Sequence, residues 1–243
     1  MLERLENLSA LYANPHRFMN LAARLHAPVW LAAVGVLALG LFMVGGVPDD
    51  YQQGATVRIM FVHVPAAWMA LFAYSFIFFA SLLAVVLRHP LGYLAARAAA
   101  PVGAVFTLVA LVTGALWGQP MWGTWWVWDA RLTSVLVLLF IYLGYIALWE
   151  AIDDYGRAAR ATSILAFVGF VNVPIVKFSV DWWNTLHQPA SVSRFARPAL
   201  HADFLYPLLV MGVAFMLLFL AITLTRLQME ILHQRLRVRQ SEG

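Results

Sequence analysis

The chain has 243 residues, of which 63% are hydrophobic and 12% are charged, and its formal net charge is +4. A soluble domain is about half apolar and about a quarter charged, so this composition excludes an ordinary soluble protein and indicates a membrane protein. The absence of cysteine excludes a disulfide framework, thiol chemistry and cysteine-ligated metals.

Six long apolar segments follow one another along the chain. A helix needs about 20 apolar residues to cross a bilayer, whereas a barrel strand would show about 10 residues of alternating polarity. The sequence therefore predicts an all-α fold: one polytopic membrane domain over residues 1–243 with six transmembrane helices. The expected spans are approximately 27–46, 62–87, 101–117, 132–149, 161–180 and 204–225.

Basic residues are distributed unevenly between the two sides of these spans. The two tails and the connections 88–100 and 150–160 carry eleven arginines, whereas the other connections carry four. Because positively charged flanks stay in the cytoplasm, both termini are expected to be cytoplasmic. The net charge then reflects topology and implies no nucleic-acid partner, and the basic stretch 226–239 is expected to contact anionic membrane lipid.

Three connections then face outward, approximately residues 47–61, 117–131 and 181–203, and the second is unusually aromatic. It holds five of the ten tryptophans and is closed by Asp129. An interfacial aromatic belt, the simplest alternative, needs only one or two tryptophans per helix end. The run therefore indicates a platform for a large flat ligand. Its tryptophans are Trp117, Trp122, Trp125, Trp126 and Trp128.

The spacing of these tryptophans allows a more specific prediction. If residues 122–129 are helical, Trp122, Trp125 and Trp128 form one aromatic stripe. The helix breakers ahead of this stripe are Gly118, Pro120 and Gly123.

Two histidines, His63 and His187, belong to different outward connections. Neutral imidazole binds iron well, and two imidazoles can hold opposite faces of a planar macrocycle. Each could instead be an isolated surface histidine, and His201 is a rival for either position.

The second, fourth and sixth helices begin on the outward side, where their dipoles favour an anionic ligand. Asp129 and Asp203 are candidate N-caps, and Pro65 is expected in the first turn of its helix. Arg58 and Arg131, with Arg194 and Arg197, add positive charge on this side.

The fifth span contains polar residues, Asn172 and Lys177, and a proline, Pro174. Polar groups within a membrane are functional candidates, but Lys177 is near enough to the outer interface to reach it by snorkelling. We therefore expect a structural role for Lys177 and a kink at Pro174.

The segment from Trp117 to Ser134 resembles the tryptophan-rich WWD signature of heme-handling membrane proteins. His63-Val-Pro-Ala-Ala67 and Trp182-Trp-Asn-Thr-Leu-His-Gln188 narrow the match. With six spans and this length, the chain resembles the heme exporter protein C family of bacterial cytochrome c maturation.

This resemblance implies a multi-pass protein of the bacterial inner membrane that carries heme b as cargo and is not an enzyme. It implies axial iron ligation by His63 and His187. It also implies three partners: a periplasmic heme chaperone, ABC transporter subunits and a small single-span membrane subunit. The platform role falls on Trp122, Trp125, Trp126, Trp128 and Asp129, in the same loop as Trp117 and Gly123.

The heme propionates are expected to meet Arg58 or Arg131 together with the helix N-termini, because charge-assisted hydrogen bonds are the stronger ones.

Other functions remain open at this stage. Heme could cross the membrane through the bundle itself. A small-molecule transporter would show broken spans with polar residues near the midplane, of which the fifth span is the only hint. A b-type cytochrome would need histidine pairs at mid-span depth, and none occurs. A purely structural assembly subunit would leave the outer tryptophans and histidines unexplained.

Overall fold

The structure, a computed structural model, describes residues 15–187, 192 and 200–242. The described part of the chain is helical. Its elements are α2 (Pro15–Gly45), the 3-10 helix η1 (Ala55–Ile59), α3 (Met60–Val86), α4 (Pro90–Trp122), α5 (Ala130–Ala151), α6 (Tyr155–Phe170), α7 (Asn172–Trp182) and α8 (Ala202–Glu242). Six helical segments are long and apolar enough to cross a membrane, with η1–α3 and α6–α7 each counted as one. For the described residues, the predicted all-α class with six candidate membrane-spanning helices is confirmed.

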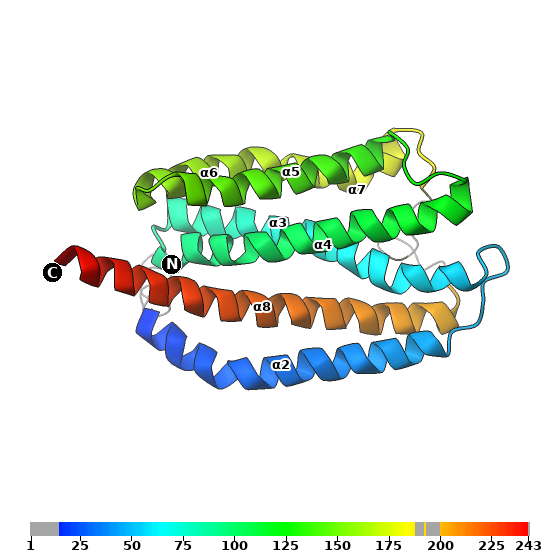
Figure 1. The fold of residues 1–243 in the computed structure, drawn as a ribbon, viewed down its shortest axis with the longest axis horizontal. Helices are drawn as coiled ribbons and strands as arrows, with labels where there is room; N and C mark the ends of the chain where they lie inside the picture. Colours follow the sequence, from blue (N-terminus) through cyan, green and yellow to red (C-terminus); the bar gives the residue numbers. More distant parts are fainter. Residues whose placement is uncertain (1–14, 188–191, 193–199, 243) are drawn as a thin grey trace, which may run out of the picture.

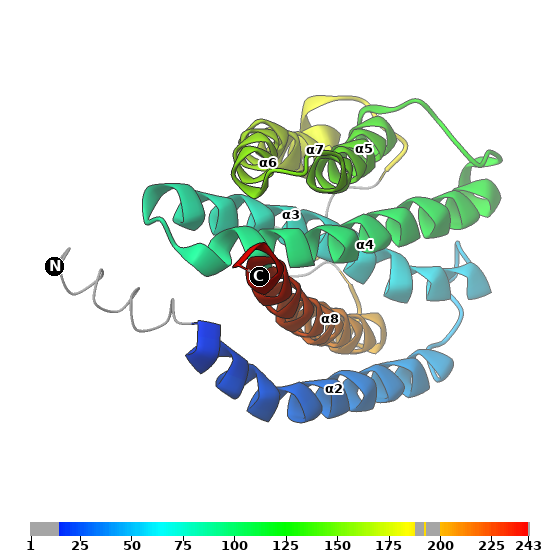
Figure 2. The same cartoon turned by 60° about the vertical axis from the view of Figure 1, so that its left-hand side comes forward.

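The helices are arranged in layers (Figure 1). Helices α3 and α4 pack along each other in the centre, with α5, α6 and α7 on one side and α8 followed by α2 on the other. The turned view in Figure 2 shows the same order. The start of α2 and the end of α8 lie at the same end of the bundle (Figure 1). That this end is cytoplasmic remains a prediction, and we call the opposite end, where α4 ends, the outer end.

Small residues allow the two central helices to approach closely. A Cβ added to Gly92 of α4 would lie 2.6 Å from the carbonyl oxygen of Ala80 in α3. Alanines recur on the buried faces of both helices, including Ala73, Ala96 and Ala99, each fully buried. In a membrane, where van der Waals packing replaces the hydrophobic effect between helices, such contacts are a main source of helix association.

Two buried tyrosines join the centre to the α5–α6 layer. The hydroxyl of Tyr74 donates to the carbonyl of Leu165 at 3.0 Å, and that of Tyr142 donates to the carbonyl of Ala70 at 2.7 Å. Their rings meet edge to face with centroids 5.2 Å apart. Each ring also packs against the backbone of a glycine, Gly169 for Tyr74 and Gly103 for Tyr142.

The end of α4 differs from the expected one. Gly118 and Pro120 lie within the helix, which stops only at Gly123, with a φ of 74° that suits glycine. Residues 123–129 are not helical. The predicted stripe of Trp122, Trp125 and Trp128 is therefore wrong.

Two predictions about outer helix starts are also corrected. Helix α3 begins at Met60, so Pro65 lies in its second turn. Helix α8 begins at Ala202, so Asp203 lies in its first turn and is not the N-cap. Both helices start before the apolar segment does, because a helix can continue beyond the bilayer core.

The fifth span is interrupted at Val171, between α6 and α7. Pro174 lacks the N–H that would bond to the carbonyl of Phe170, so the helix cannot continue regularly there. The expected break near Pro174 is confirmed, while Arg194 and Arg197 lie outside the described residues.

The close packing at Gly169 can be tested by Gly169→Ala. The new methyl group would collide with the Tyr74 hydroxyl and lie 2.7 Å from Cγ2 of Ile141, and overpacking costs about 1–3 kcal/mol. We expect a lower thermal unfolding midpoint in detergent, followed by circular dichroism. The matched control is Gly35→Ala, which has no atom within 4 Å of its added Cβ. Equal midpoints for the two variants would contradict the packing.

Candidate functional site

The outer ends of α3, α4, α5 and α7 enclose a cavity of about 350 Å³, a size typical of small-molecule sites. Most of its wall is apolar, including Trp68, Leu71 and Leu138 deeper in the bundle. Its charged or strongly polar side chains are Gln53, His63, Arg131, Lys177 and His187. The two histidines and one of the two arginines singled out by the sequence thus share one cavity.

His63 lies in the first turn of α3 and is held by α4. Its Nδ1 lies 3.0 Å from the carbonyl oxygen of Ala110 and 3.1 Å from Oγ1 of Thr113. Because a carbonyl can only accept, Nδ1 carries the proton and Nε2 keeps its lone pair. Gly114 leaves room for the ring, since a Cβ there would lie 3.0 Å from Cε1 of His63.

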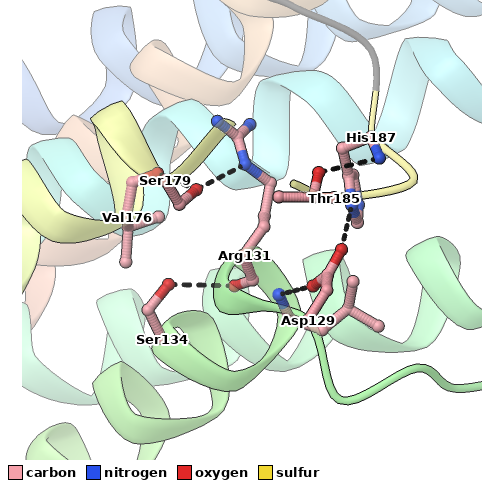
Figure 3. Close-up of polar contacts among 8 residues, drawn as sticks. Asp129, Arg131, Ser134, Val176, Ser179, Thr185 and His187 are labelled. Atoms are coloured by element: carbon pink, nitrogen blue, oxygen red, sulfur yellow. Dashed lines mark hydrogen bonds and ion pairs between the residues drawn. The ribbon is translucent and has the colours of Figure 1, made fainter. Parts of the chain in front are cut away.

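His187 also has an acceptor beside its Nδ1 atom, although it lies in the non-helical segment after α7. Its Nδ1 lies 3.2 Å from Oδ2 of Asp129 (Figure 3). The carboxylate accepts from Nδ1, which again leaves Nε2 as the basic nitrogen. Burial lowers the pKa of His187, and the nearby Asp129 carboxylate only partly opposes this. The imidazole is therefore neutral at neutral pH, which is the form that binds a metal.

Asp129 is also the N-cap of α5. Its Oδ1 accepts a 2.8 Å hydrogen bond from the backbone N–H of Leu132, so the predicted capping role is confirmed. One oxygen of the Asp129 carboxylate thus caps α5, and the other contacts His187, a candidate iron ligand.

Two of the five tryptophans in the aromatic run lie against the histidines. Trp117 meets His63 edge to face at 5.7 Å, and Trp122 meets His187 in the same manner at 4.9 Å. The indole N–H of Trp117 donates to Oε1 of Gln53 at 2.9 Å. Both tryptophans come from the last turns of α4 and line the cavity.

The other three tryptophans occupy the non-helical segment after Gly123 and do not line this cavity. Trp125 is 59% exposed and Trp128 74% exposed. Trp126 packs edge to face on Trp128 at 5.4 Å. The aromatic run is thus divided into an inner pair beside the histidines and an outer group.

The two arginines proposed to meet the propionates have different surroundings. Nε of Arg131 donates to Oγ of Ser179 at 3.0 Å (Figure 3), and its side chain lines the cavity. Arg58 pairs with Asp49 at 2.7 Å, donates to the carbonyl of Val47 at 2.8 Å, and is not part of the cavity wall.

His201, the rival ligand, also lies away from the cavity. Its side chain is 74% exposed and pairs with Asp203 at 3.2 Å. Of the histidines at the outer end of the bundle, His63 and His187 line the cavity and His201 does not.

The sequence reasoning missed the cavity residues Gln53 and Lys177, and it missed Thr113, which contacts His63 from α4. Lys177 was expected to reach the membrane interface, yet it lines the cavity. The signal that could have identified Thr113 is its helical spacing with Ala110 and Gly114, which puts all three on the face of α4 that meets His63.

Known proteins resemble this chain over nearly its whole length. The family model for heme exporter protein C matches residues 8–242. The heme exporter protein C of Bradyrhizobium diazoefficiens is 59% identical over 93% of this chain and 86% of its own. That of Paracoccus denitrificans is 48% identical over 93% of this chain and 94% of its own. A putative cytochrome c biosynthesis mitochondrial protein of Marchantia polymorpha is 50% identical over 70% of this chain and 72% of its own.

The role of Asp129 in fixing the His187 tautomer can be tested with Asp129→Asn. The amide oxygen can still cap α5, which leaves an NH2 group facing Nδ1. Because that group donates, we expect the His187 proton to move to Nε2. Nitrogen NMR of histidine-labelled protein would report the tautomer.

Asp154→Asn is the matched control, because Asp154 caps α6 through Arg157 N–H at 2.7 Å. It should leave the His187 tautomer unchanged. An unaltered tautomer in Asp129→Asn would show that the carboxylate does not set it.

Proposed function

Because the chain belongs to the heme exporter protein C family, we propose that it binds heme b at the periplasmic face of the bacterial inner membrane. It presents this cargo to a periplasmic heme chaperone for cytochrome c biogenesis. The chain acts as a transport protein and not as an enzyme. The observation that carries the proposal is one largely apolar cavity lined by two histidines, His63 and His187, with each Nδ1 engaged.

The chemistry of the cavity fits heme. The apolar wall suits the porphyrin, and the Nε2 atoms of His63 and His187 are the groups that would bind the iron. Trp117 and Trp122 keep the two imidazoles in place by edge contacts, each worth about 0.5–1.5 kcal/mol beyond the area buried. Arg131 supplies positive charge for a propionate from the cavity wall.

The outer tryptophans fit a role in handover. Trp125 and Trp128, which follow the cavity residue Trp122 in the chain, are largely exposed, as are Trp182 and Trp183 at the end of α7. Exposed aromatic groups are typical of protein interaction sites, and we assign this surface to the heme chaperone. ABC transporter subunits and a small single-span subunit are the further partners of the proposed export complex.

Passage of heme through the bundle is less well supported than delivery at the outer face. Among the described residues, Ile77, Tyr74 and Tyr142 are fully buried below the cavity. Tyr74 of α3 and Tyr142 of α5 pack against each other, so a route to the cytoplasm would require this core to open. A small-molecule transporter is favoured only by the break at Val171.

The two ligands can be tested by His63→Ala and His187→Ala. We expect the wild-type protein with heme to give a six-coordinate, low-spin absorption spectrum. Each variant should lose that spectrum or its heme, because one axial position is then without imidazole.

The matched control is His201→Ala, whose side chain is exposed and outside the cavity wall, and it should keep the wild-type spectrum. A wild-type protein without a Soret band after heme supply would contradict the proposed function. A wild-type spectrum in both ligand variants would contradict the assignment of the ligands.

The proposed orientation can be tested with single cysteines, because the natural chain has none. Gln52→Cys lies in the first outer loop and Asp153→Cys between α5 and α6, at exposed positions. A membrane-impermeant thiol reagent should label Gln52→Cys in intact spheroplasts and Asp153→Cys only after lysis. The reverse pattern would invert the topology.

A further inference from the structure

Gln53 lies in the loop ahead of η1, and its side chain forms part of the cavity wall. The indole N–H of Trp117 donates to its Oε1 at 2.9 Å. Because an indole N–H can only donate, the Gln53 amide presents its oxygen to Trp117 and keeps its two N–H groups for another partner. The contact with Trp117 therefore fixes the orientation of the amide.

The backbone of Gln53 is held as well. Its N–H donates to Oδ1 of Asp50 at 2.9 Å, and its carbonyl accepts from the Thr56 hydroxyl at 2.6 Å. Asp50 and Gly54, on either side of it, pair through their backbone groups with N···O distances of 2.8 and 3.2 Å. A side-chain donor held at both ends loses little conformational entropy when it binds a ligand.

The N–H groups of this amide have no acceptor among the described residues. Gln53 is half-buried, and most of the cavity wall around it is apolar. A ligand that covers this wall displaces water from Nε2, and a donor that loses its water without gaining an acceptor weakens binding. The ligand that fits this cavity therefore brings an acceptor to Gln53.

We infer that Nε2 of Gln53 donates to a propionate of heme and that Trp117 orients the amide for this contact. The inference rests on the proposed function and adds a neutral donor to it. Apart from the nitrogens that bind the iron, the propionates are the hydrogen-bond acceptors of heme b. Trp117 also contacts His63 edge to face at 5.7 Å, so one indole connects a candidate iron ligand with the propionate donor. Gln53 is then a specificity-determining residue and Trp117 a positioning residue.

Gln53→Glu tests this contact, because a carboxylate still accepts from Trp117 but replaces the donor by a negative charge. Full-length protein in detergent is titrated with heme b and with its dimethyl ester, whose propionates are uncharged, and binding is followed by the Soret band. We expect the wild type to bind heme more tightly than the ester. Gln53→Glu should reduce this preference by about tenfold or more, since one charge-assisted hydrogen bond is lost. Trp117→Phe keeps a ring beside His63 without the N–H and should lose part of the preference.

The matched control is Gln52→Glu, which adds the same charge at an exposed position of the same loop. It should keep the wild-type preference. An unchanged preference in Gln53→Glu would overturn the inference, and so would an equal loss in the two variants. Equal affinity of the wild type for heme and ester would overturn it and leave heme binding intact. Absence of a Soret band from the wild type with both porphyrins would instead overturn the proposed function.

A second measurement observes the hydrogen bond without relying on affinity. The propionate bending modes in the resonance Raman spectrum of bound heme shift when a hydrogen bond to a propionate is lost. Gln53→Leu, which removes the amide without adding charge, should shift a propionate mode, and Gln52→Leu should not. Unchanged propionate modes in Gln53→Leu would overturn the inference.

Discussion

The outer end of the structure depends on the two contacts of the Asp129 carboxylate. One oxygen accepts from Leu132 N–H at 2.8 Å and starts α5, and the other lies 3.2 Å from Nδ1 of His187. Helix capping places the carboxylate, and the carboxylate then places the imidazole. His187 lies in a non-helical segment, but its contact with the cap of α5 restricts the orientation of its side chain. This restriction reduces the conformational entropy that is lost when a ligand binds.

The two candidate iron ligands belong to different layers of the bundle. His63 is held within the central pair, by contacts from α3 to Ala110 and Thr113 of α4. His187 is held by α5, with Arg131 on the same turn as the Asp129 cap. The central pair is closely packed through small residues, whereas His187 lies beyond the last turn of α7. In the proposed heme site, one rigid and one less restrained ligand would suit binding that must later be reversed.

Local rules predicted part of this arrangement. Hydropathy predicted the six spans, and the position of Asp129 before Arg131 and Leu132 predicted the cap. The ends of the helices were harder, because α4 begins at Pro90 in a stretch of alanines that forms helix without strong hydropathy. The contact of His63 with Ala110 spans 47 residues. No local pattern contains that distance. The predicted topology made His63 and His187 a candidate pair, with His201 as a rival, and the resemblance to a family selected them.

The tryptophan run shows why a sequence motif need not be one structural unit. Gly123, in a left-handed conformation, ends α4 within the run. Trp117 and Trp122 therefore lie in the helix and contact the histidines, while Trp125 and Trp128 lie in a non-helical segment and are exposed. The inner pair can hold the ligand residues in place and the outer group can meet a partner. A carrier that delivers its cargo needs a binding surface and a partner surface close together. In this chain, the helix end at Gly123 separates the inner tryptophans from the outer ones.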